Sequence, residues 1–228
     1  MSKIKLRARA LEEIWAEKGS ETFDSRNYAN LHKARRQYLA ESIVNTNPTS
    51  VLEIGCFGGH NLEEIHEMNP DIKLTGFDIN KDALHFLNKT KSHLKINTVC
   101  GSAYELKDHF SDKQFDVVFT SGVLIHIPCG TLDSDFPEKY TVYGDRGKQD
   151  LFLQDISLVE DVCKSILAIS QNYIFHGEHH GEKFENIKGT QQRYIHNFHD
   201  LYKEESVVIE KAFNASNGFE HLIKVTCR

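Results

Sequence analysis

The chain has 228 residues, of which 39% are hydrophobic and 26% charged, with a formal net charge of −6. This length and apolar content suit one domain with a sizeable core, and no segment approaches the ~20 apolar residues that a membrane span requires. The acidic balance argues against a surface that follows a nucleic-acid backbone, because phosphate binding requires clustered Lys and Arg. We therefore expect neither nucleic acid nor membrane among the partners.

Five cysteines are scattered along the chain, and no two of them form a Cys-x-x-Cys pair. An odd number at irregular spacing is typical of free thiols in a reducing compartment, not of a disulfide framework or a zinc site. The first residues, "MSKIKLRARALEEIW", are charged throughout and lack the apolar core of a signal peptide. We therefore expect a cytoplasmic protein.

Two helices are predicted before the first strand, at residues 2–18 and 30–42, with a break rich in Gly, Ser, Asp and Asn between them. The basic cluster of the second helix, which contains Arg35 and Arg36, favours a solvated face. The apolar stripe of the first helix is predicted to consist of Leu6, Leu11, Ile14 and Trp15. Together these helices form a predicted cap over residues 1–44.

From residue 49 onward, short apolar runs alternate with amphipathic stretches. The runs "SVLEIG", "KLTGFDI", "INTVCG" and "FDVVFTSG" are predicted strands, and "NLEEIHEM" and "DALHFLNKTK" are helices between them. This alternation is typical of a parallel sheet wound with crossover helices, and strands that are apolar on both faces agree with it. The sequence therefore predicts a Rossmann-like, doubly wound α/β fold over residues 45–228, in one domain with the cap.

The second half of the chain predicts how this sheet ends. A long connection at residues 128–149 precedes a helix at 150–170 and a fifth strand, "NYIFHG". The last two strands, "SVVIEKAF" and "HLIKVTC", are separated only by "NASNG". Such a connection is too short for a parallel crossover, so we expect a C-terminal antiparallel hairpin.

A glycine-rich turn follows the first strand in "VLEIGCFGGHNLEEI", residues 51–65. Ligands of open α/β sheets bind outside the carboxyl ends of the strands, and glycine lets them approach the backbone. The dinucleotide fingerprint G-x-G-x-x-G would require glycine where this chain has Phe57 and His60. An ordinary tight turn is the alternative interpretation.

Two carboxylates accompany this turn. Glu53 lies two residues before Gly55, and Asp78 ends the second strand, where a carboxylate can accept both ribose hydroxyls. An acid ahead of the glycines indicates a ligand with a positive group instead of a pyrophosphate.

This combination resembles the class I S-adenosylmethionine-dependent methyltransferases. Their first motif, E/D-x-G-x-G-x-G, is matched here by Glu53-Ile-Gly55-Cys56-Phe57-Gly-Gly59. The likeness continues through Asp78, "CGSAYEL" at 100–106 and "FDVVFTSGVLIHIP" at 115–128, and covers roughly residues 45–175.

The resemblance implies S-adenosylmethionine as the cofactor and assigns residues to its parts. Glu53 and Gly55 would lie at the methionine end, with Ser121 beneath it, and Cys56 and Gly59 belong to the same turn. Asp78 would bind the ribose. Three residues would contact the adenine: Ile79, Ser102 and Ala103. From the cap, Tyr28 would face the sulfonium through a cation–π contact, worth about 0.5–2 kcal/mol.

Two residues depart from the family pattern. Phe57 replaces the middle glycine of the motif, so its side chain must point away from the ligand or lie beside it. Ser102 stands where an aspartate often meets the adenine amino group, which implies a weaker or water-mediated contact at that position.

A narrower resemblance links "GVLIHIP" and "IWAEKGSETFDSRNY" to the methylases associated with pseudaminic acid biosynthesis. The segment "GEHHGEKFENIKG" corresponds loosely to a Glu-Tyr-Tyr segment of that group, with His179 and His180 at the tyrosine positions. The resemblance implies that the acceptor is a hydroxyl of a sugar or a related small molecule.

Methyl transfer from a sulfonium to a hydroxyl requires alignment and a base. Alignment supplies effective molarities that can reach ~10⁵ M or more, and a base adds about 10²–10⁴-fold. His126 follows the fourth strand and is the first candidate for the base. A structural histidine at a helix start is the alternative.

The run "HGEHH" follows the fifth strand on the same rim. We expect Glu178 and His179 to act as substrate contacts or an auxiliary base, and His180 to contact substrate. A metal site is disfavoured, because the spacing does not fit a helical His-x-x-x-His and adjacent histidines diverge on an extended chain. A solvated strand exit is the remaining alternative.

The long connection at 128–149 has the length of a binding loop. Tyr140, Tyr143 and Arg146 could hold a polar or anionic small molecule there, although an ordinary insertion is an alternative. Arg193 and His196 could close the cavity from another side, or belong to a surface near a helix start.

The prediction is a metal-independent methyltransferase that acts on a small polar metabolite, and a homodimer is considered for its assembly. The alternatives are an N-methyltransferase acting on an amine or peptide, and a non-catalytic adenosylmethionine-binding protein. A nucleic-acid methyltransferase is disfavoured by the acidic charge.

Overall fold

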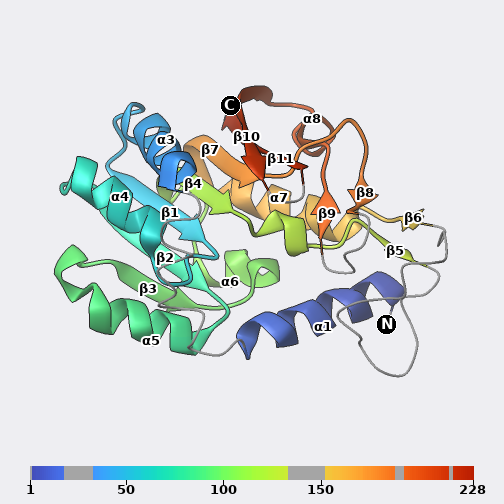
Figure 1. Cartoon of the computed structure of the whole chain (residues 1–228), viewed down its shortest axis with the longest axis horizontal. Helices are drawn as coiled ribbons and strands as arrows, with labels where there is room; N and C mark the ends of the chain where they lie inside the picture. Colours follow the sequence, from blue (N-terminus) through green and yellow to red (C-terminus); the bar gives the residue numbers. More distant parts are fainter. Residues whose placement is uncertain (1, 18–32, 133–151, 188–192, 216–217) are drawn as a thin grey trace.

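The computed structural model describes residues 2–17, 33–132, 152–187, 193–215 and 218–228. Its main feature is a seven-stranded sheet in the order β10-β11-β7-β4-β1-β2-β3 (Figure 1). The strands are β1 (Ser50–Ile54), β2 (Lys73–Asp78), β3 (Asn97–Cys100), β4 (Phe115–Ser121), β7 (Ser170–Glu178), β10 (Ser206–Ala215) and β11 (Gly218–Thr226).

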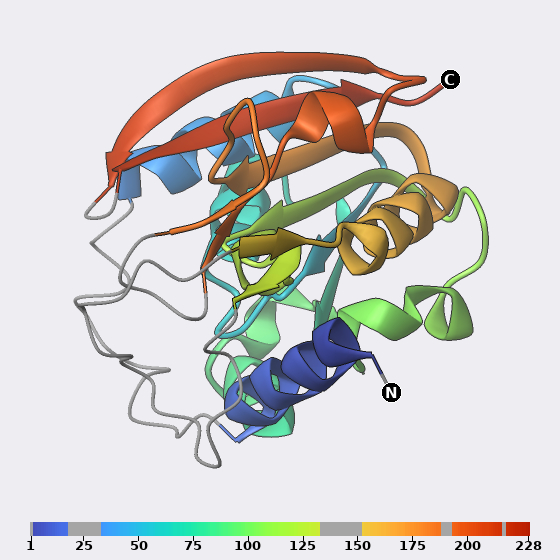
Figure 2. The same cartoon turned by 90° about the vertical axis from the view of Figure 1, so that its right-hand side faces the viewer.

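The strand directions confirm the predicted fold class. β1 pairs in parallel with both β2 and β4, β2 with β3, and β4 with β7. β11 is antiparallel to β7 and to β10, so the terminal hairpin extends the sheet on one side (Figure 2). Strand order reverses at β1 and β4, and the carboxyl ends of these strands meet at the point where doubly wound folds bind their ligands.

Helices cover both faces of the sheet. The α-helices are α1 (Lys3–Ala16), α3 (Lys33–Val44), α4 (His60–Met68), α5 (Lys81–Thr90), α6 (Leu106–His109), α7 (Ser157–Ile169) and α8 (Phe198–Leu201). The 3-10 helices among the described residues are η2 (Ser92–Leu94), η3 (Ala103–Glu105) and η4 (Leu124–His126). Within the described parts of the chain, no helix has both the length and the apolar content to cross a bilayer.

Two small antiparallel sheets were not predicted. One pairs β5 (Gly130–Leu132) with β6 (Phe152–Gln154), and the other pairs β8 (Glu185–Asn186) with β9 (Tyr194–Ile195). The expected loop at 128–149 therefore begins with a strand, and β6 occupies the start of the helix expected at 150–170. β5 and β6 are each only three residues long, which is too short for an alternating pattern to reveal them.

The apolar face of α1 differs from the predicted stripe. Leu11 is buried as expected, but Leu6 and Ile14 are 38% and 37% exposed, and Ile4 and Ala8 are buried in their place. Small side chains such as Ala8 allow the helix to lie close to its neighbours, a role that a count of large apolar residues does not detect. α1 contacts β5 and lies on the opposite side of the molecule from the terminal hairpin (Figure 2).

Gly59 is a position where a side chain cannot be accommodated. It precedes α4 with φ +71°, and a Cβ atom there would lie 1.9 Å from Leu87 Cδ1 of α5. We expect Gly59→Ala to lower the melting temperature more than Gly122→Ala does. Gly122 is the matched control, because it has the same φ of +71° but open space where a Cβ atom would lie.

The difference between the two variants isolates the steric contact from the backbone penalty. The left-handed conformation costs a non-glycine residue about 1–2 kcal/mol, which corresponds to a few degrees in a domain of this size, at about 2–4 °C per kcal/mol. Thermal unfolding followed by circular dichroism measures the melting temperatures of both variants. Equal shifts would show that Leu87 moves aside at no cost, contrary to this prediction.

Candidate active site

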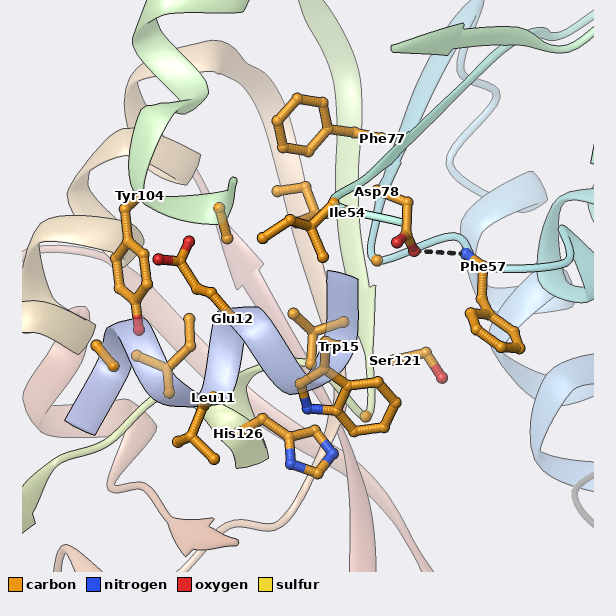
Figure 3. Close-up of a pocket in the computed structure, with 17 residues that line it drawn as sticks. Leu11, Glu12, Trp15, Ile54, Phe57, Phe77, Asp78, Tyr104, Ser121 and His126 are labelled. Atoms are coloured by element: carbon orange, nitrogen blue, oxygen red, sulfur yellow. Dashed lines mark hydrogen bonds between the residues drawn. The ribbon is translucent and has the colours of Figure 1, made fainter. Parts of the chain in front are cut away.

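A cavity of about 350 Å³ lies at the carboxyl ends of β1, β2 and β4 and is covered by α1 (Figure 3). Residues predicted from sequence to bind the cofactor or to react contribute to its wall: Gly55, Phe57, Asp78, Ile79, Ala103, Ser121 and His126. The sequence interpretation did not assign the other lining residues to the site, among them Leu11, Glu12 and Trp15 from α1 and Tyr104 from η3. The predicted residues of four separate segments therefore do meet around one space.

The glycine turn is held close to β2 and to the segment after β4. Gly55 has φ +73°, and a Cβ atom there would lie 2.2 Å from Val123 Cγ2, so only glycine fits. Phe57 also takes a left-handed conformation, with φ +45°, and its backbone N–H donates to Asp78 Oδ2 at 2.7 Å. The Phe57 ring points away from the centre of the cavity (Figure 3). This is one of the two orientations expected for the residue that replaces the motif glycine.

Asp78 is fixed at the end of β2 with its carboxylate facing the cavity. Oδ1 accepts the backbone N–H of Asn80 at 2.8 Å, and Oδ2 accepts that of Phe57. Burial raises the pKa of Asp78, and the backbone hydrogen bonds oppose this effect. A carboxylate still has acceptor capacity after these two bonds, since each oxygen carries two lone pairs.

Glu53 faces the other side of the sheet, among the residues near α3 and α4. Its Oε1 accepts the Asn61 side-chain N–H at 2.6 Å. Both Glu53 Oε2 and Asn61 Oδ1 are buried without a hydrogen-bond partner among the described residues. Burial raises the pKa of Glu53 well above its usual range; the Asn61 hydrogen bond opposes this effect, the charge of Asp78 adds to it, and Arg35 lowers the pKa slightly. Glu53 is not part of the wall of the cavity that Asp78 lines.

Arg35 connects this buried region to the cavity. The side chain extends from α3, forms an ion pair with Glu220 of β11, and donates from Nη2 to Ser121 Oγ at 3.1 Å. Its Nε is buried with no hydrogen-bond partner in the described structure. The expected solvated face is wrong for Arg35 and Arg36, whose side chains are only 13% and 9% exposed. Buried partners on distant strands cannot be detected from helical periodicity.

Glu178 is almost completely buried, and it holds η4 in place. Its two oxygens accept the backbone N–H groups of residues 123–125 at 2.8–3.1 Å, and Oε1 also accepts the Thr120 hydroxyl at 2.9 Å. His196, fully buried, hydrogen-bonds to Leu124 O through Nε2 at 2.7 Å. Burial raises the pKa of Glu178 and lowers that of His196 to about 4. The geometry therefore favours a positioning role for both residues over the expected contact with substrate.

His126, the last residue of η4, lies at the cavity wall next to Trp15 of α1. The two ring centroids are 4.5 Å apart, with the ring planes tilted by 54° (Figure 3). His126 therefore follows β4 and lines the cavity, and its role in the reaction stays a prediction.

The histidines after β7 lie outside the wall of this cavity. His179 is 5% exposed, its Nε2 lies 3.9 Å from Glu220 Oε1, and burial lowers its pKa. The His180 ring lies 5.6–5.7 Å from those of His199 and His221. Among the described residues, no group of three or more His, Cys, Asp or Glu side chains has the arrangement of a metal site.

The remaining predicted residues have other surroundings or lie outside the described ranges. Cys56 is buried, and a Cβ atom at Gly76 would lie 2.7 Å from its Sγ. The backbone carbonyl of Arg193 accepts hydrogen bonds from the Ile187 N–H and the Asn186 side chain. The expectations for Tyr28, Tyr140, Tyr143 and Arg146 fall on residues that the structure does not describe.

Residues 51–147 match the family model of a methyltransferase domain, and this span includes the glycine turn, Asp78 and His126. No curated protein sequence matches the chain.

Solved structures share the fold at low sequence identity. Magnesium protoporphyrin IX methyltransferase from Synechocystis PCC 6803 with bound SAM has a TM-score of 0.67 at 9% identity, covering 97% of each chain. The 1,6-didemethyltoxoflavin-N1-methyltransferase from Burkholderia thailandensis, with S-adenosylhomocysteine, has a TM-score of 0.63 at 12% identity, covering 100% of this chain and 91% of that one.

The narrower resemblance to methylases of pseudaminic acid biosynthesis stays a prediction. The broader one agrees with both comparisons, and so does the predicted cofactor, since these neighbours were crystallised with it or with its demethylated product. The chain has the fold of an S-adenosylmethionine-dependent methyltransferase and matches the methyltransferase domain over residues 51–147.

Proposed function

We propose that this protein is a methyltransferase that uses S-adenosylmethionine to methylate a small polar metabolite, at a hydroxyl of a sugar or a related compound. The observation that carries the proposal is a set of buried polar atoms without partners among the described residues. Glu53 Oε2 and Asn61 Oδ1 are acceptors, and Arg35 Nε is a donor. Buried polar atoms are rarely left unpaired, because each such atom costs about 1–3 kcal/mol.

These atoms have the chemistry that an amino-acid group requires. An α-ammonium is a donor only, and suits the two acceptors; an α-carboxylate is an acceptor only, and suits Arg35. Arg35 also contacts Ser121, which lines the cavity, so the two regions are adjacent. Asp78 supplies acceptors for a ribose diol, and Ile54, Ile79 and Ala103 supply an apolar surface for a flat ring.

The cofactor would supply an activated methyl group on its sulfonium, and residues of this chain would provide binding and proton transfer. His126 would accept the proton of an acceptor hydroxyl at the cavity wall. Glu178 and His196 would act through the backbone of η4, by fixing where His126 lies. His179 would be the candidate for an auxiliary base, although it lies near Glu220 and outside the cavity wall; burial lowers its pKa and so favours its neutral form.

The acceptor class is supported by charge and by the neighbours. A net charge of −6 disfavours nucleic acid, and the two solved enzymes described above are named for small-molecule substrates. N-methylation is a second candidate, because the neighbour from Burkholderia thailandensis methylates a nitrogen according to its name. We propose no nucleic-acid or membrane partner.

Binding of product and of a truncated ligand tests the proposed function. We expect the protein to bind S-adenosylhomocysteine in calorimetry, and Glu53→Gln to weaken this binding about 10- to 100-fold through loss of a charge-assisted hydrogen bond to the ammonium. 5′-Methylthioadenosine lacks the amino-acid group, so its affinity should stay unchanged. Glu67→Gln is the matched control, because Glu67 lies on α4 like Asn61 but is exposed. No binding of either ligand by the wild-type protein would refute the proposal.

The proposed contact between Glu53 and the ammonium group also predicts that the affinity for S-adenosylhomocysteine depends on pH. Because its pKa is raised, the Glu53 carboxyl of the free protein keeps its proton to a higher pH than usual, whereas a bound ammonium favours the carboxylate. Binding of S-adenosylhomocysteine should therefore release a proton, and affinity should rise with pH until the pH exceeds that raised pKa. Asp78 titrates as well, but 5′-methylthioadenosine also contacts it, so the difference between the ligands reports on Glu53. An equal pH dependence for both ligands would contradict the assignment.

A further inference from the structure

Glu12 lies at the end of the cavity opposite Asp78. It extends from α1, and Figure 3 shows its carboxylate beside Tyr104, with Ile54 between it and Asp78. The two carboxylates therefore stand at the two ends of a slot whose middle is apolar, formed by residues such as Ile54, Phe77 and Ala103. A ligand that fits this slot needs hydrogen-bond donors at both ends and a flat apolar body between them.

Ser102 cannot be the main acceptor at this end. Its Oγ already accepts the backbone N–H of Tyr104 at 3.1 Å, and its hydroxyl donates to Glu12 Oε1. A carboxylate has about four lone-pair sites, so Glu12 keeps acceptor capacity after this bond, whereas the hydroxyl of Ser102 has little left. The hydrogen bond also directs the Glu12 carboxylate toward η3, which forms this end of the cavity.

The electrostatics at the Glu12 end of the cavity agree with a site that accepts a hydrogen bond from a ligand. Burial raises the pKa of Glu12, and the hydrogen bond from Ser102 opposes this effect. After burial, the charge of Glu12 is the next largest cause that raises the pKa of the Tyr104 hydroxyl. The described positive group that acts on Glu12 is Arg9, a weaker influence than burial or Ser102. A neutral N–H donor from a ligand would stabilise the carboxylate without requiring a buried cation.

We propose that Glu12 recognises the exocyclic amino group of the purine, and so supplies from α1 the acidic contact that Ser102 does not provide. The inference rests on the proposed function, and it names the residue that selects adenine. It also gives α1 a part in ligand selectivity, beyond covering the cavity. A competing interpretation is that Glu12 only tethers α1 to η3 through Ser102.

A pair of ligands separates these interpretations. The probes are S-adenosylhomocysteine and its 6-deamino analogue, in which hydrogen replaces the amino group. We expect the wild-type protein to bind the first about 10- to 100-fold more tightly, as for loss of one charge-assisted hydrogen bond, and Glu12→Ala to reduce this ratio to near 1. Glu12→Gln should give an intermediate ratio, because its amide oxygen still accepts. Ser102→Ala should keep most of the ratio.

Glu13 provides the control on the same helix. Its side chain is 63% exposed and lies 3.4 Å from Arg9, so Glu13→Ala should leave the ratio at the wild-type value. If Glu12→Ala weakens both ligands equally, Glu12 is a tether and the inference fails. The inference is also wrong if Glu12→Ala leaves the affinity ratio of the two ligands unchanged, or if Ser102→Ala alone removes it. In each of these cases, binding of S-adenosylhomocysteine would still support the proposed function. If the wild-type protein binds neither ligand, the proposed function fails and the inference fails with it.

Discussion

Asp78→Ala is expected to abolish measurable binding of both S-adenosylhomocysteine and 5′-methylthioadenosine. The two ligands share the ribose, and Asp78 is the carboxylate at the end of β2 that faces the cavity. Each hydrogen bond to a charged group contributes about 1.5–3 kcal/mol, so loss of two of them lowers affinity by more than about 100-fold, at 1.4 kcal/mol per factor of ten.

Asp78→Ala should also weaken binding by removing backbone hydrogen bonds at the site. Asp78 accepts the backbone N–H groups of Phe57, which helps to hold the glycine turn against β2, and of Asn80, which precedes α5. Without these bonds the turn keeps only the hydrogen bonds of the Gly55 and Cys56 N–H groups to Phe77 O, and the N–H groups of Phe57 and Asn80 lose their acceptor. We therefore expect a lower melting temperature together with the loss of binding.

The measurement is calorimetry with both ligands, together with thermal unfolding of each variant. Asp82→Ala is the matched control, because Asp82 is an exposed aspartate in the first turn of α5, close to Asp78 in sequence. If folded Asp78→Ala binds either ligand within about threefold of wild type, a change of under ~0.7 kcal/mol, the ribose assignment is wrong.

His126→Gln is expected to reduce turnover about 10²–10⁴-fold, the contribution typical of a general base. Affinity for S-adenosylhomocysteine should change far less, because the glutamine side chain retains much of the contact with Trp15. The assay follows the production of S-adenosylhomocysteine from labelled S-adenosylmethionine with a metabolite extract that contains the acceptor. A fall in turnover with nearly constant cofactor affinity distinguishes a reacting group from a wall residue.

His179→Gln serves as the comparison for this variant. His179 is buried near Glu220 and is not part of the cavity wall. If His179→Gln loses turnover and His126→Gln does not, the base is His179 and His126 has only a packing role. If the acceptor is an amine that binds deprotonated, neither variant should fall by as much as 10²-fold, which would favour N-methylation.

Local sequence was sufficient for the strands and for the residues at their ends. The runs that became β1, β2, β4 and β7 have apolar centres rich in Val, Leu, Ile and Phe, a pattern typical of a parallel sheet covered on both faces. Residues that directly follow such strands must meet at one edge, so Asp78, Ser121 and His126 could be placed together before any coordinates. The five-residue connection alone predicted the antiparallel hairpin.

Contacts between segments far apart in sequence could not be predicted in the same way. Arg35 is 185 residues from its partner Glu220, and Glu12 is 90 residues from Ser102. Glu178 looks in sequence like part of a polar rim, yet the amides of residues 123–125 take both of its oxygens. No periodicity records such pairs, because a polar side chain has the same local pattern whether it is solvated or buried against a partner.

The sequence by itself determined the strands of the parallel core, the glycine turn and the carboxylate that ends β2, because these follow from short-range rules of chain geometry and burial. Only the tertiary structure decided that α1 forms a wall of the cavity with Glu12, that Arg35 is buried, and that Glu178 supports η4. The physical reason is that burial and hydrogen-bond partners are properties of the packed molecule. A charged residue acquires its role only when distant elements surround it.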